Sequence, residues 1–210
     1  MFKLMVVTDR KRVSRPLTET VRLALEGGAD AVQLREGDLP TQELHHLALE
    51  LRKITRDAGA KLIINQRADV ALAVEADGVH LGWRSLSIKD VRELCPFGPE
   101  ASGSRDGKKL LVGISCHDAM QLHSAEEARA DYALLGPVFP TPSKEGRVAP
   151  IGLETFRTLA SGAKIPIIAI GGITAQNAGQ ARQAGAAGVA AISAIVAAQD
   201  PRVAARSLLG

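Results

Sequence analysis

The chain has 210 residues, of which 23% are charged and 46% hydrophobic, and its formal net charge is +3. This is the composition of an ordinary globular protein, and its apolar stretches are far shorter than the roughly 20 residues that span a bilayer. Aromatic residues make up only 3%, which argues against a nucleic-acid-binding protein that stacks bases on aromatic side chains. We therefore expect neither a nucleic-acid partner nor a membrane partner.

The two cysteines, Cys95 and Cys116, form no Cys-x-x-Cys motif. Isolated free thiols are typical of the reducing cytosol. The N-terminus runs directly into strand-like sequence without the pattern of a signal peptide. We expect a cytoplasmic protein. No cluster of His, Cys and Asp has the spacing of a metal site, so the residues themselves predict no metal.

Short β-branched runs recur along the chain and alternate with helical patterns. In chain order, we expect strands at Lys3–Thr8, Ala31–Arg35, Lys61–Asn65, Gly78–Leu81, Leu110–Ser115, Tyr132–Leu135, Ile165–Ile170 and Gly188–Ile192. Their starts are about 26 residues apart, which leaves room for one crossover helix after each strand.

Several of the intervening helices carry their own end signals. The first, Pro16–Glu26, ends at a Gly-Gly pair, and the second begins behind Thr41 as the expected N-cap and ends near Gly59. Ser87-Ile88-Lys89-Asp90 has the form of a capping box, with Asp where Glu or Gln is usual. A further helix is expected at Thr174–Ala184, before Gly185.

Strict alternation of strands and helices requires a parallel sheet with right-handed crossovers. Eight such units predict an α/β protein with a single-domain (β/α)8 TIM barrel that spans residues 1–210. A doubly wound sheet is the alternative, but it usually carries a glycine-rich fingerprint after its first strand. Here the first strand is followed by Asp9-Arg10-Lys11-Arg12. The barrel is therefore the better interpretation.

Phosphate binding is the clearest functional signal. Active sites of such barrels lie at the C-terminal ends of the strands, and the loops after strands seven and eight are the usual phosphate site. Gly171 and Gly172 follow the seventh expected strand, and Ile192 and Ser193 follow the eighth. Both loops precede a helix, where free backbone N–H groups bind anions. The alternative is that the glycines only form a tight turn, but two matched loops favour phosphate.

Other polar residues follow neighbouring strands. Thr141, Ser143 and Lys144 lie in the long loop after the sixth strand, where Lys144 can bind a phosphate or carboxylate. This loop is otherwise interpreted as solvated Pro/Gly-rich chain. His117, just past the fifth strand and two residues beyond Ser115, is a candidate general acid/base because histidine changes its charge near neutral pH. A core or helix-capping histidine is the alternative.

Eight segments, in order and along nearly the whole chain, resemble the thiamine phosphate synthase/TenI family, whose fold is a (β/α)8 barrel. The segments are Val7-Thr8-Asp9, Gln33-Leu34-Arg35-Glu36, Ile64-Asn65, Ala76–Gly82, Gly113–His117, Asp131-Tyr132 with Gly136–Thr141, Ala169–Ile173 and Ala191–Ile195.

The synthase branch of this family joins a pyrimidine pyrophosphate to a thiazole phosphate and releases pyrophosphate with Mg²⁺. The chain departs from the synthase pattern at three places. Gly37 replaces a lysine, Gln66 replaces an aspartate that binds the metal, and Trp83-Arg84-Ser85 replaces the run that ends in the second aspartate ligand. Mg²⁺ is normally bound through one or two carboxylates plus phosphate, so the resemblance at these positions points away from a metal.

The same positions resemble the other branch, the thiazole tautomerase TenI. Asn65-Gln66-Arg67 is similar to its Asn-Gly-Arg, and Ser85–Lys89 to its Ser-Phe-Ser-Pro-Lys. That branch implies an isomerase without a cofactor, in which His117 moves a proton on a thiazole carboxylate phosphate.

In this hypothesis every other site residue binds the small phosphorylated heterocycle. Arg35, Asn65 and Thr141 would orient it, and Trp83 either covers the ring or packs at the rim. Ser115, Ser143 and Lys144 would also bind the substrate. Its phosphate would be bound by Gly171, Gly172, Ile192 and Ser193.

The resemblance thus predicts a thiamine-biosynthesis enzyme of the tautomerase branch. Two alternatives stay open: a true synthase, which would use Mg²⁺, and a non-catalytic regulatory protein that keeps only the phosphate pocket. The residues leave homo-oligomerisation undecided.

Overall fold

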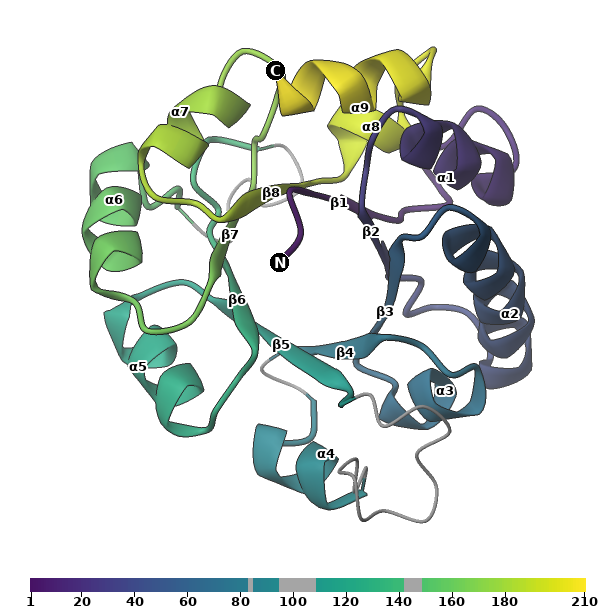
Figure 1. Cartoon of the computed structure of the whole chain (residues 1–210), viewed down its shortest axis with the longest axis horizontal. Coiled ribbons are helices and arrows are strands. Elements are labelled where there is room, and N and C mark those ends of the chain that lie inside the picture. The colour runs from purple at the N-terminus through teal and green to yellow at the C-terminus, as the bar shows by residue number, and fades with distance from the viewer. Residues whose placement is uncertain (83–84, 95–108, 142–148) are drawn as a thin grey trace.

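The chain forms a closed barrel of eight parallel strands, as the computed structural model of residues 1–82, 85–94, 109–141 and 149–210 shows (Figure 1). The strands are β1 (Leu4–Val7), β2 (Ala31–Leu34), β3 (Lys61–Asn65), β4 (Gly78–Leu81), β5 (Leu111–Cys116), β6 (Tyr132–Leu135), β7 (Ile167–Ile170) and β8 (Gly188–Ala191). Each strand pairs with its neighbours in chain order, and β1 closes on β8 with Met5 opposite Ala190. The predicted (β/α)8 barrel is confirmed.

Helices surround the barrel on its outside (Figure 1). They are α1 (Leu17–Glu26), α2 (Thr41–Asp57), α3 (Ala68–Ala73), α4 (Ile88–Leu94), α5 (Ala119–Glu127), α6 (Leu153–Gly162), α7 (Ala178–Gln183), α8 (Ser193–Val196) and α9 (Pro201–Leu209). The expected capping box forms at α4, where the Asp90 amide donates to Ser87 Oγ over 3.1 Å and the Ser87 amide donates to Asp90 Oδ2 over 3.0 Å.

Two expected helix starts are wrong. Thr41 is the first residue of α2 and not its N-cap, because its hydroxyl instead accepts a hydrogen bond from Arg67 Nη1 over 3.1 Å. The helix expected from Thr174 begins only at Ala178. The Thr174 amide donates to Asn177 Oδ1 over 2.8 Å, and Asn177 Nδ2 donates to the Gly172 carbonyl over 2.8 Å. The Thr174 carbonyl accepts from the Ala178 amide over 2.9 Å, so the chain makes a single turn bounded by these side-chain bonds before the continuous helix begins.

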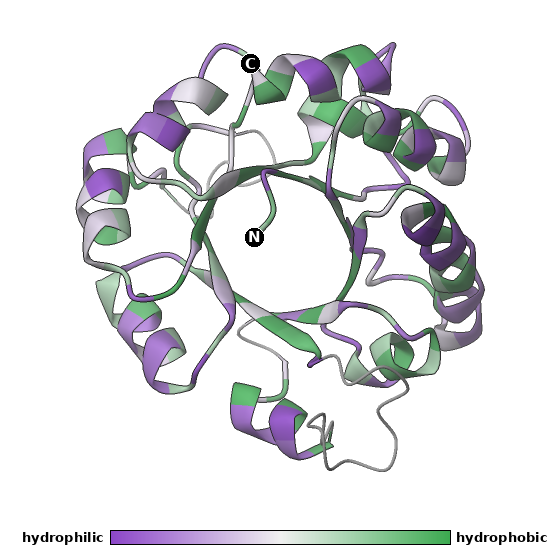
Figure 2. Ribbon diagram, in the orientation of Figure 1, coloured by the Kyte–Doolittle hydropathy of each residue, from purple (hydrophilic) through white to green (hydrophobic). Residues whose placement is uncertain are grey.

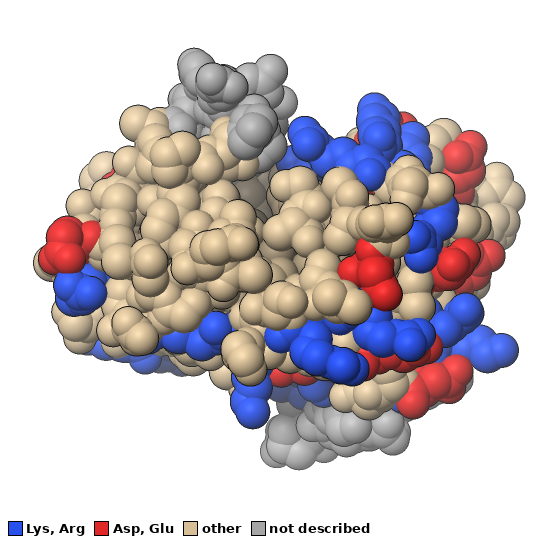
Figure 3. Space-filling model, turned by 90° about the horizontal axis from the view of Figure 1, so that it is seen from above, with Lys and Arg blue, Asp and Glu red and all other residues tan. Residues whose placement is uncertain are grey.

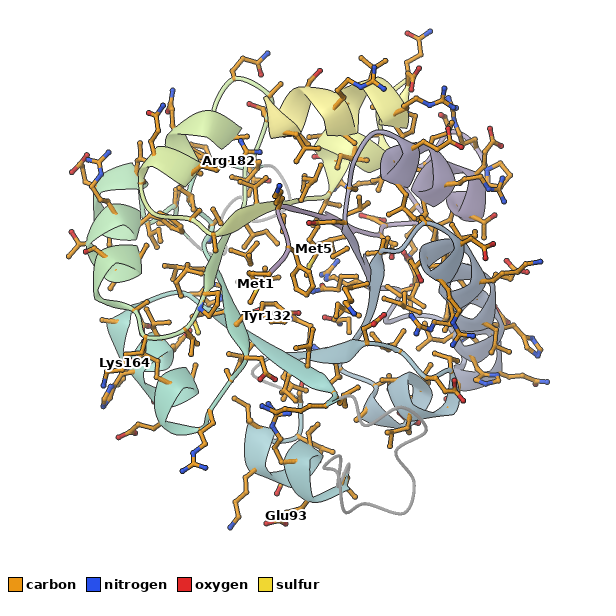
Figure 4. All side chains as sticks on the ribbon, viewed as in Figure 1. Met1, Met5, Glu93, Tyr132, Lys164 and Arg182 are labelled. Atoms are coloured by element: carbon orange, nitrogen blue, oxygen red, sulfur yellow. The ribbon has the colours of Figure 1, made fainter. Side chains whose placement is uncertain are left out.

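Two apolar layers fill the fold. The larger one lies between the strands and the helices, and the smaller one fills the barrel interior. Figure 2 shows the hydrophobic residues along the strands and the mixture of hydrophobic and hydrophilic residues along the helices. Figure 4 shows Met5 and Tyr132 inside the ring of strands, where both are fully buried. The Phe2 ring packs edge-on against Tyr132 with centroids 5.3 Å apart, so the interior is packed at the N-terminal end of the barrel.

Three aspartates tie strands together at that N-terminal end. Asp30, Asp77 and Asp131 each come directly before an even-numbered strand. Each carboxylate accepts a backbone N–H from the preceding odd-numbered strand, with Asp131 Oδ2 lying 2.7 Å from the Val112 nitrogen. We interpret these aspartates as residues that stabilise the fold and not as site residues, because the active sites of such barrels lie at the opposite end.

Charged side chains of both signs are mixed on the outer surface. On the face shown in Figure 3, Lys and Arg lie beside Asp and Glu over the half that carries α1, and the other half is mostly uncharged. Within the described ranges, none of the helices has the length and apolar character needed to span a membrane.

Candidate active site

A pocket of about 450 Å³ opens at the C-terminal ends of the strands. Its floor is formed by inward-facing strand residues, and its rim by the residues that follow the strands. It brings together most of the predicted site, namely Arg35, Asn65, Ser115, His117, Thr141, Gly171, Gly172, Ile192 and Ser193. The other three predicted residues, Trp83, Ser143 and Lys144, lie outside the described residues.

The loop after β7 is shaped by its two glycines. Gly171 and Gly172 have φ values of +93° and +65°, in the left-handed region. A Cβ atom would lie 2.4 Å from Pro137 Cβ at the first position and 2.5 Å from the Pro140 carbonyl oxygen at the second. The backbone therefore requires both glycines whatever the loop binds, so their presence alone does not indicate phosphate.

Free backbone amides lie at this end of the pocket. Gly172, Ile173 and Ser193 line the pocket, and their backbone N–H groups donate to no other group in the described part of the chain. Buried or half-buried amides normally have a partner. Amides that converge on one pocket are suited to the oxygens of a phosphate.

His117 is held at the pocket by its ring nitrogen Nδ1, which contacts the Gly136 carbonyl oxygen. A carbonyl only accepts, so Nδ1 carries the proton and Nε2 remains to accept or, when protonated, to donate. The alternative of a helix-capping histidine does not hold, because Asp118 caps α5 by accepting from the Gln121 amide over 2.8 Å. The neighbouring Cys116 is buried in the outer layer, where burial raises the pKa of its thiol to about 12.

Arg35 is positioned by β1 and β2 together. Its backbone N–H donates to Thr8 Oγ1 over 2.9 Å at the end of β1. The Arg35 side chain is exposed and lines both the main pocket and a neighbouring cavity of about 630 Å³ over the ends of β1 to β5. Arg35 therefore provides a cation to both spaces.

The carboxylates beside this second cavity are already paired with cations. Asp38 Oδ1 lies 2.6 Å from Arg10 Nη1, and Asp9 Oδ2 lies 2.9 Å from Arg12 Nε. Glu36, only 4% exposed, accepts from the Arg10 backbone nitrogen over 3.0 Å. Hydrogen bonds from Arg10 hold the pKa of Asp38 well below its usual range. These carboxylates fix the loop after β1 and are not free ligands.

The donor set does not fit a Mg²⁺ ion held by protein carboxylates. Gln66 and Ser85 occupy the two positions where the synthase pattern has aspartate ligands, and Ser85 Oγ accepts the Gly82 amide over 2.8 Å. Across the described ranges, no three His, Cys, Asp or Glu side chains are grouped as metal ligands. Neutral amide and hydroxyl groups do not supply the charge that such sites normally use.

Five polar residues that line the pocket were not among the predicted site residues: Asp9, Arg12, Gln33, His80 and Thr174. Gln33 and His80 are buried polar residues within strands β2 and β4. The signal was the strand period of two, since both residues alternate with apolar neighbours and thus face the barrel interior. Arg12 gave no such signal, because its position depends on the path of the loop.

A closed (β/α)8 barrel defines the chain as a TIM-barrel protein, and its pocket lies at the C-terminal ends of the strands, where the active sites of this fold are found. Residues 4–195 match the family described as thiamine monophosphate synthase, and the chain belongs to this family.

Similar proteins span almost the whole chain. A thiamine-phosphate synthase from Moorella thermoacetica is 45% identical over 97% of this chain and 91% of its own length. One from Pyrococcus furiosus is 42% identical over 99% of this chain and 93% of its own length. The solved structure of thiamine phosphate pyrophosphorylase from Pyrococcus furiosus has 41% identity and a TM-score of 0.86, and the match covers 98% of this chain and 93% of that one.

The predicted tautomerase activity, and with it the isomerase class and the TenI branch, is wrong. Relatives at 40–45% identity over most or nearly all of the chain are named as synthases, which are transferases. The prediction gave three loop positions more weight than eight matching segments. Loop residues vary more than the strands that carry them, so three substitutions did not identify the reaction.

Proposed function

We propose that the chain is a thiamine-phosphate synthase, a transferase that joins a pyrimidine pyrophosphate to a thiazole phosphate and releases pyrophosphate. The observation that carries this proposal is the 45% identity, along nearly the full length, to a protein named for that activity. The family acts on small phosphorylated substrates, and the pocket geometry is suited to them.

The two adjoining cavities offer space for two substrates. They share Asp9, Arg35, Asn65, Ser115 and His117. We place the thiazole phosphate on the free amides of Gly172, Ile173 and Ser193 and the pyrimidine pyrophosphate in the second cavity. The shared residues then lie between the substrates, where the new bond forms.

Charge develops on the leaving pyrophosphate as the reaction proceeds. A bond from the pyrimidine substrate to the thiazole forms, the bond to the pyrophosphate oxygen breaks, and its electron pair leaves with pyrophosphate. Arg35 and Ser115 are placed to donate hydrogen bonds to that oxygen, as is His117 once Nε2 is protonated. Fixed donors aimed at developing charge are the largest contribution in many enzymes.

Mg²⁺ accompanies the synthase reaction in this family, but the donor set described above does not fit a protein-held metal. We therefore assign no step to a metal. Among the described residues, we assign the balance of substrate charge chiefly to Arg35, which lines both cavities, because Arg12 is paired with Asp9.

The proposal is tested by incubating the purified protein with both substrates and measuring thiamine phosphate and pyrophosphate, with Mg²⁺ and with a chelator. Formation of both products in equal amounts is expected. We expect Arg35→Gln to lower kcat/KM by about 10²–10³-fold, the usual effect of removing one charge-stabilising donor. The matched control, Arg22→Gln, removes an exposed cation on α1 and should leave the rate unchanged. Absence of product at saturating substrate with and without Mg²⁺ would refute the assignment.

A further inference from the structure

We propose that Tyr132 and His80 form a buried hydrogen-bond relay that fixes the hydroxyl of Ser115 as a donor toward an anion in the pocket. Tyr132 does not line the pocket, so it is a positioning residue that acts through His80 and Ser115. The inference deepens the proposed function, on which it rests for the identity of the anion as a substrate pyrophosphate.

The register of three strands creates the relay. His80 on β4 pairs with Gly113 on β5, and Gly113 pairs with Tyr132 on β6. Gly113 has no side chain, and the Tyr132 ring crosses the space above it: a Cβ atom there would lie 2.0 Å from Tyr132 Cζ. The ring therefore spans a whole strand and reaches His80.

Two hydrogen bonds then connect the ring to the pocket. The Tyr132 hydroxyl lies 3.3 Å from His80 Nδ1, and His80 Nε2 lies 2.9 Å from Ser115 Oγ. Ser115 is two residues beyond Gly113 on β5, so both positions face the barrel interior. Ser115 lines both cavities.

His80 and Tyr132 are both neutral. His80 is 2% exposed and Tyr132 is fully buried. Burial disfavours the charged forms, so it lowers the pKa of His80 to about 3 and raises the pKa of Tyr132. A neutral imidazole has one donor nitrogen and one acceptor nitrogen. The hydrogen bonds of the relay can therefore point in only two ways, one for each neutral tautomer of His80.

The buried Tyr132 proton selects between these directions. Among the described residues, His80 Nδ1 is the acceptor within hydrogen-bond distance of the Tyr132 hydroxyl, and a buried O–H without an acceptor is costly. Tyr132 therefore donates to Nδ1, and the imidazole proton lies on Nε2 and is donated to Ser115 Oγ. The Ser115 proton is then free to point into the pocket.

The other tautomer of His80, with the proton on Nδ1, is unfavourable at both Tyr132 and Ser115. It would leave the Tyr132 proton without an acceptor and would use the Ser115 proton on His80. Ser115 would then present only oxygen lone pairs to an anionic substrate. Satisfaction of the buried hydroxyl and recognition of an anion thus require the same tautomer of His80.

A double-mutant cycle tests the relay. We expect Tyr132→Phe, which removes only the hydroxyl, to weaken binding of inorganic pyrophosphate by about 3- to 10-fold, the usual effect of one hydrogen bond, and to lower kcat/KM for synthase turnover similarly. In a Ser115→Ala background the same change should have no effect, because its target is gone. An equal loss in both backgrounds would show that Tyr132 acts only through packing and would overturn the relay. So would a lack of pyrophosphate binding by the wild-type protein.

Ile168→Val is the matched control for packing. Ile168 is fully buried in the same inner layer and makes no contact through a hydroxyl. We expect any effect of this change on pyrophosphate binding to be the same with Ser115 and with Ala at that position.

The tautomer of His80 is a second measurement that needs neither substrate nor turnover. The ¹⁵N chemical shifts of the ring distinguish a protonated from a bare nitrogen, and the chain has 5 histidines, so the signals are assigned with His80→Gln. We expect Nε2 protonated and Nδ1 bare, and the reverse would overturn the relay even if Tyr132→Phe fails to fold. If this tautomer and the pyrophosphate cycle hold but no synthase product forms, the relay stands and the proposed function falls.

Discussion

At the scale of the residue, Gly113 shows how a missing side chain organises the barrel interior. The Tyr132 ring fills the space that a Cβ atom at this position would need, with the nearest ring atom 2.0 Å away. We expect Gly113→Ala to lower the free energy of unfolding by about 1–3 kcal/mol, the usual cost of overpacking a core. Urea denaturation followed by circular dichroism measures this change.

Gly179→Ala is the control for that substitution. Gly179 lies within α7, and a Cβ atom there would meet nothing within 4 Å. Alanine in a helix is favoured over glycine by about 0.5–1 kcal/mol, so this variant should be more stable than wild type. Equal effects of the two substitutions would contradict the packing described for Tyr132.

Part of the active site is predictable from sequence because it depends on local position. Arg35, Asn65 and His117 follow from the ends of their strands, since the end of each strand marks the rim of the barrel. The contact between His80 and Tyr132 is not predictable in this way. It depends on the register of three strands and on a glycine between the two rings, and no local pattern encodes that register.

At the scale of the element, the aspartates before the even-numbered strands fasten pairs of strands. Asp131 accepts from Arg92 Nη2 over 2.5 Å, from Lys109 Nζ over 2.8 Å and from the Val112 nitrogen over 2.7 Å. Asp131→Asn removes the charge and turns one acceptor into a donor that faces these groups. We expect the free energy of unfolding to fall by about 1.5–3 kcal/mol, the range for hydrogen bonds to charged groups. Urea denaturation at neutral pH measures this change.

Asp57→Asn is the surface control for this substitution. Asp57 is exposed at the end of α2, and surface changes usually stay within about 0.5 kcal/mol. A comparable loss in both variants would contradict a special role for Asp131.

Asp77 and Asp131 also make the free energy of unfolding depend on pH. Burial alone would raise the pKa of Asp77 and of Asp131, but hydrogen bonds from lysine, arginine and backbone donors lower both. An aspartate whose pKa is lowered in the folded state stabilises the protein fully at pH values above its unfolded-state pKa of about 3.9. This stabilisation is lost as the pH falls through the folded-state pKa. We expect the stability of Asp131→Asn to fall less steeply than that of wild type below about pH 4, as measured by urea midpoints across that range. Parallel curves would contradict the assignment.

The order and type of the strands were predictable because each has a short, largely apolar run of strand length. Their ends were predictable to within two residues or fewer: the strand expected from Ile165 begins at Ile167, since Pro166 has no N–H for the ladder. Helix starts were less predictable. Thr174 carries the side chain of an N-cap, but the Asn177 side chain accepts the Thr174 amide and donates to the Gly172 carbonyl, and the sequence alone does not show that the helix begins only after Asn177.

At the scale of the whole molecule, the two ends of the chain close the barrel together. β1 pairs with β8, and α9 packs on α1, where Arg202 pairs with Glu26 (Figure 1). Because the sheet has no edge, a loss at the last helix should weaken every strand and not only those nearby. The barrel is therefore expected to unfold as one cooperative unit.

Leu208→Ala tests this cooperativity. Leu208 is 1% exposed in α9, and truncation of a buried leucine costs about 2–5 kcal/mol. Hydrogen exchange of the slowest amides should report the same loss in β1 and in β5, which lies on the opposite side of the barrel (Figure 1). Val203→Ala in the same helix is the control, since Val203 is 57% exposed and should change stability by less than about 0.5 kcal/mol. Unchanged protection in β5 together with lost protection in β1 would mean that the closed sheet opens locally, and that closure by α9 does not stabilise the active-site strands.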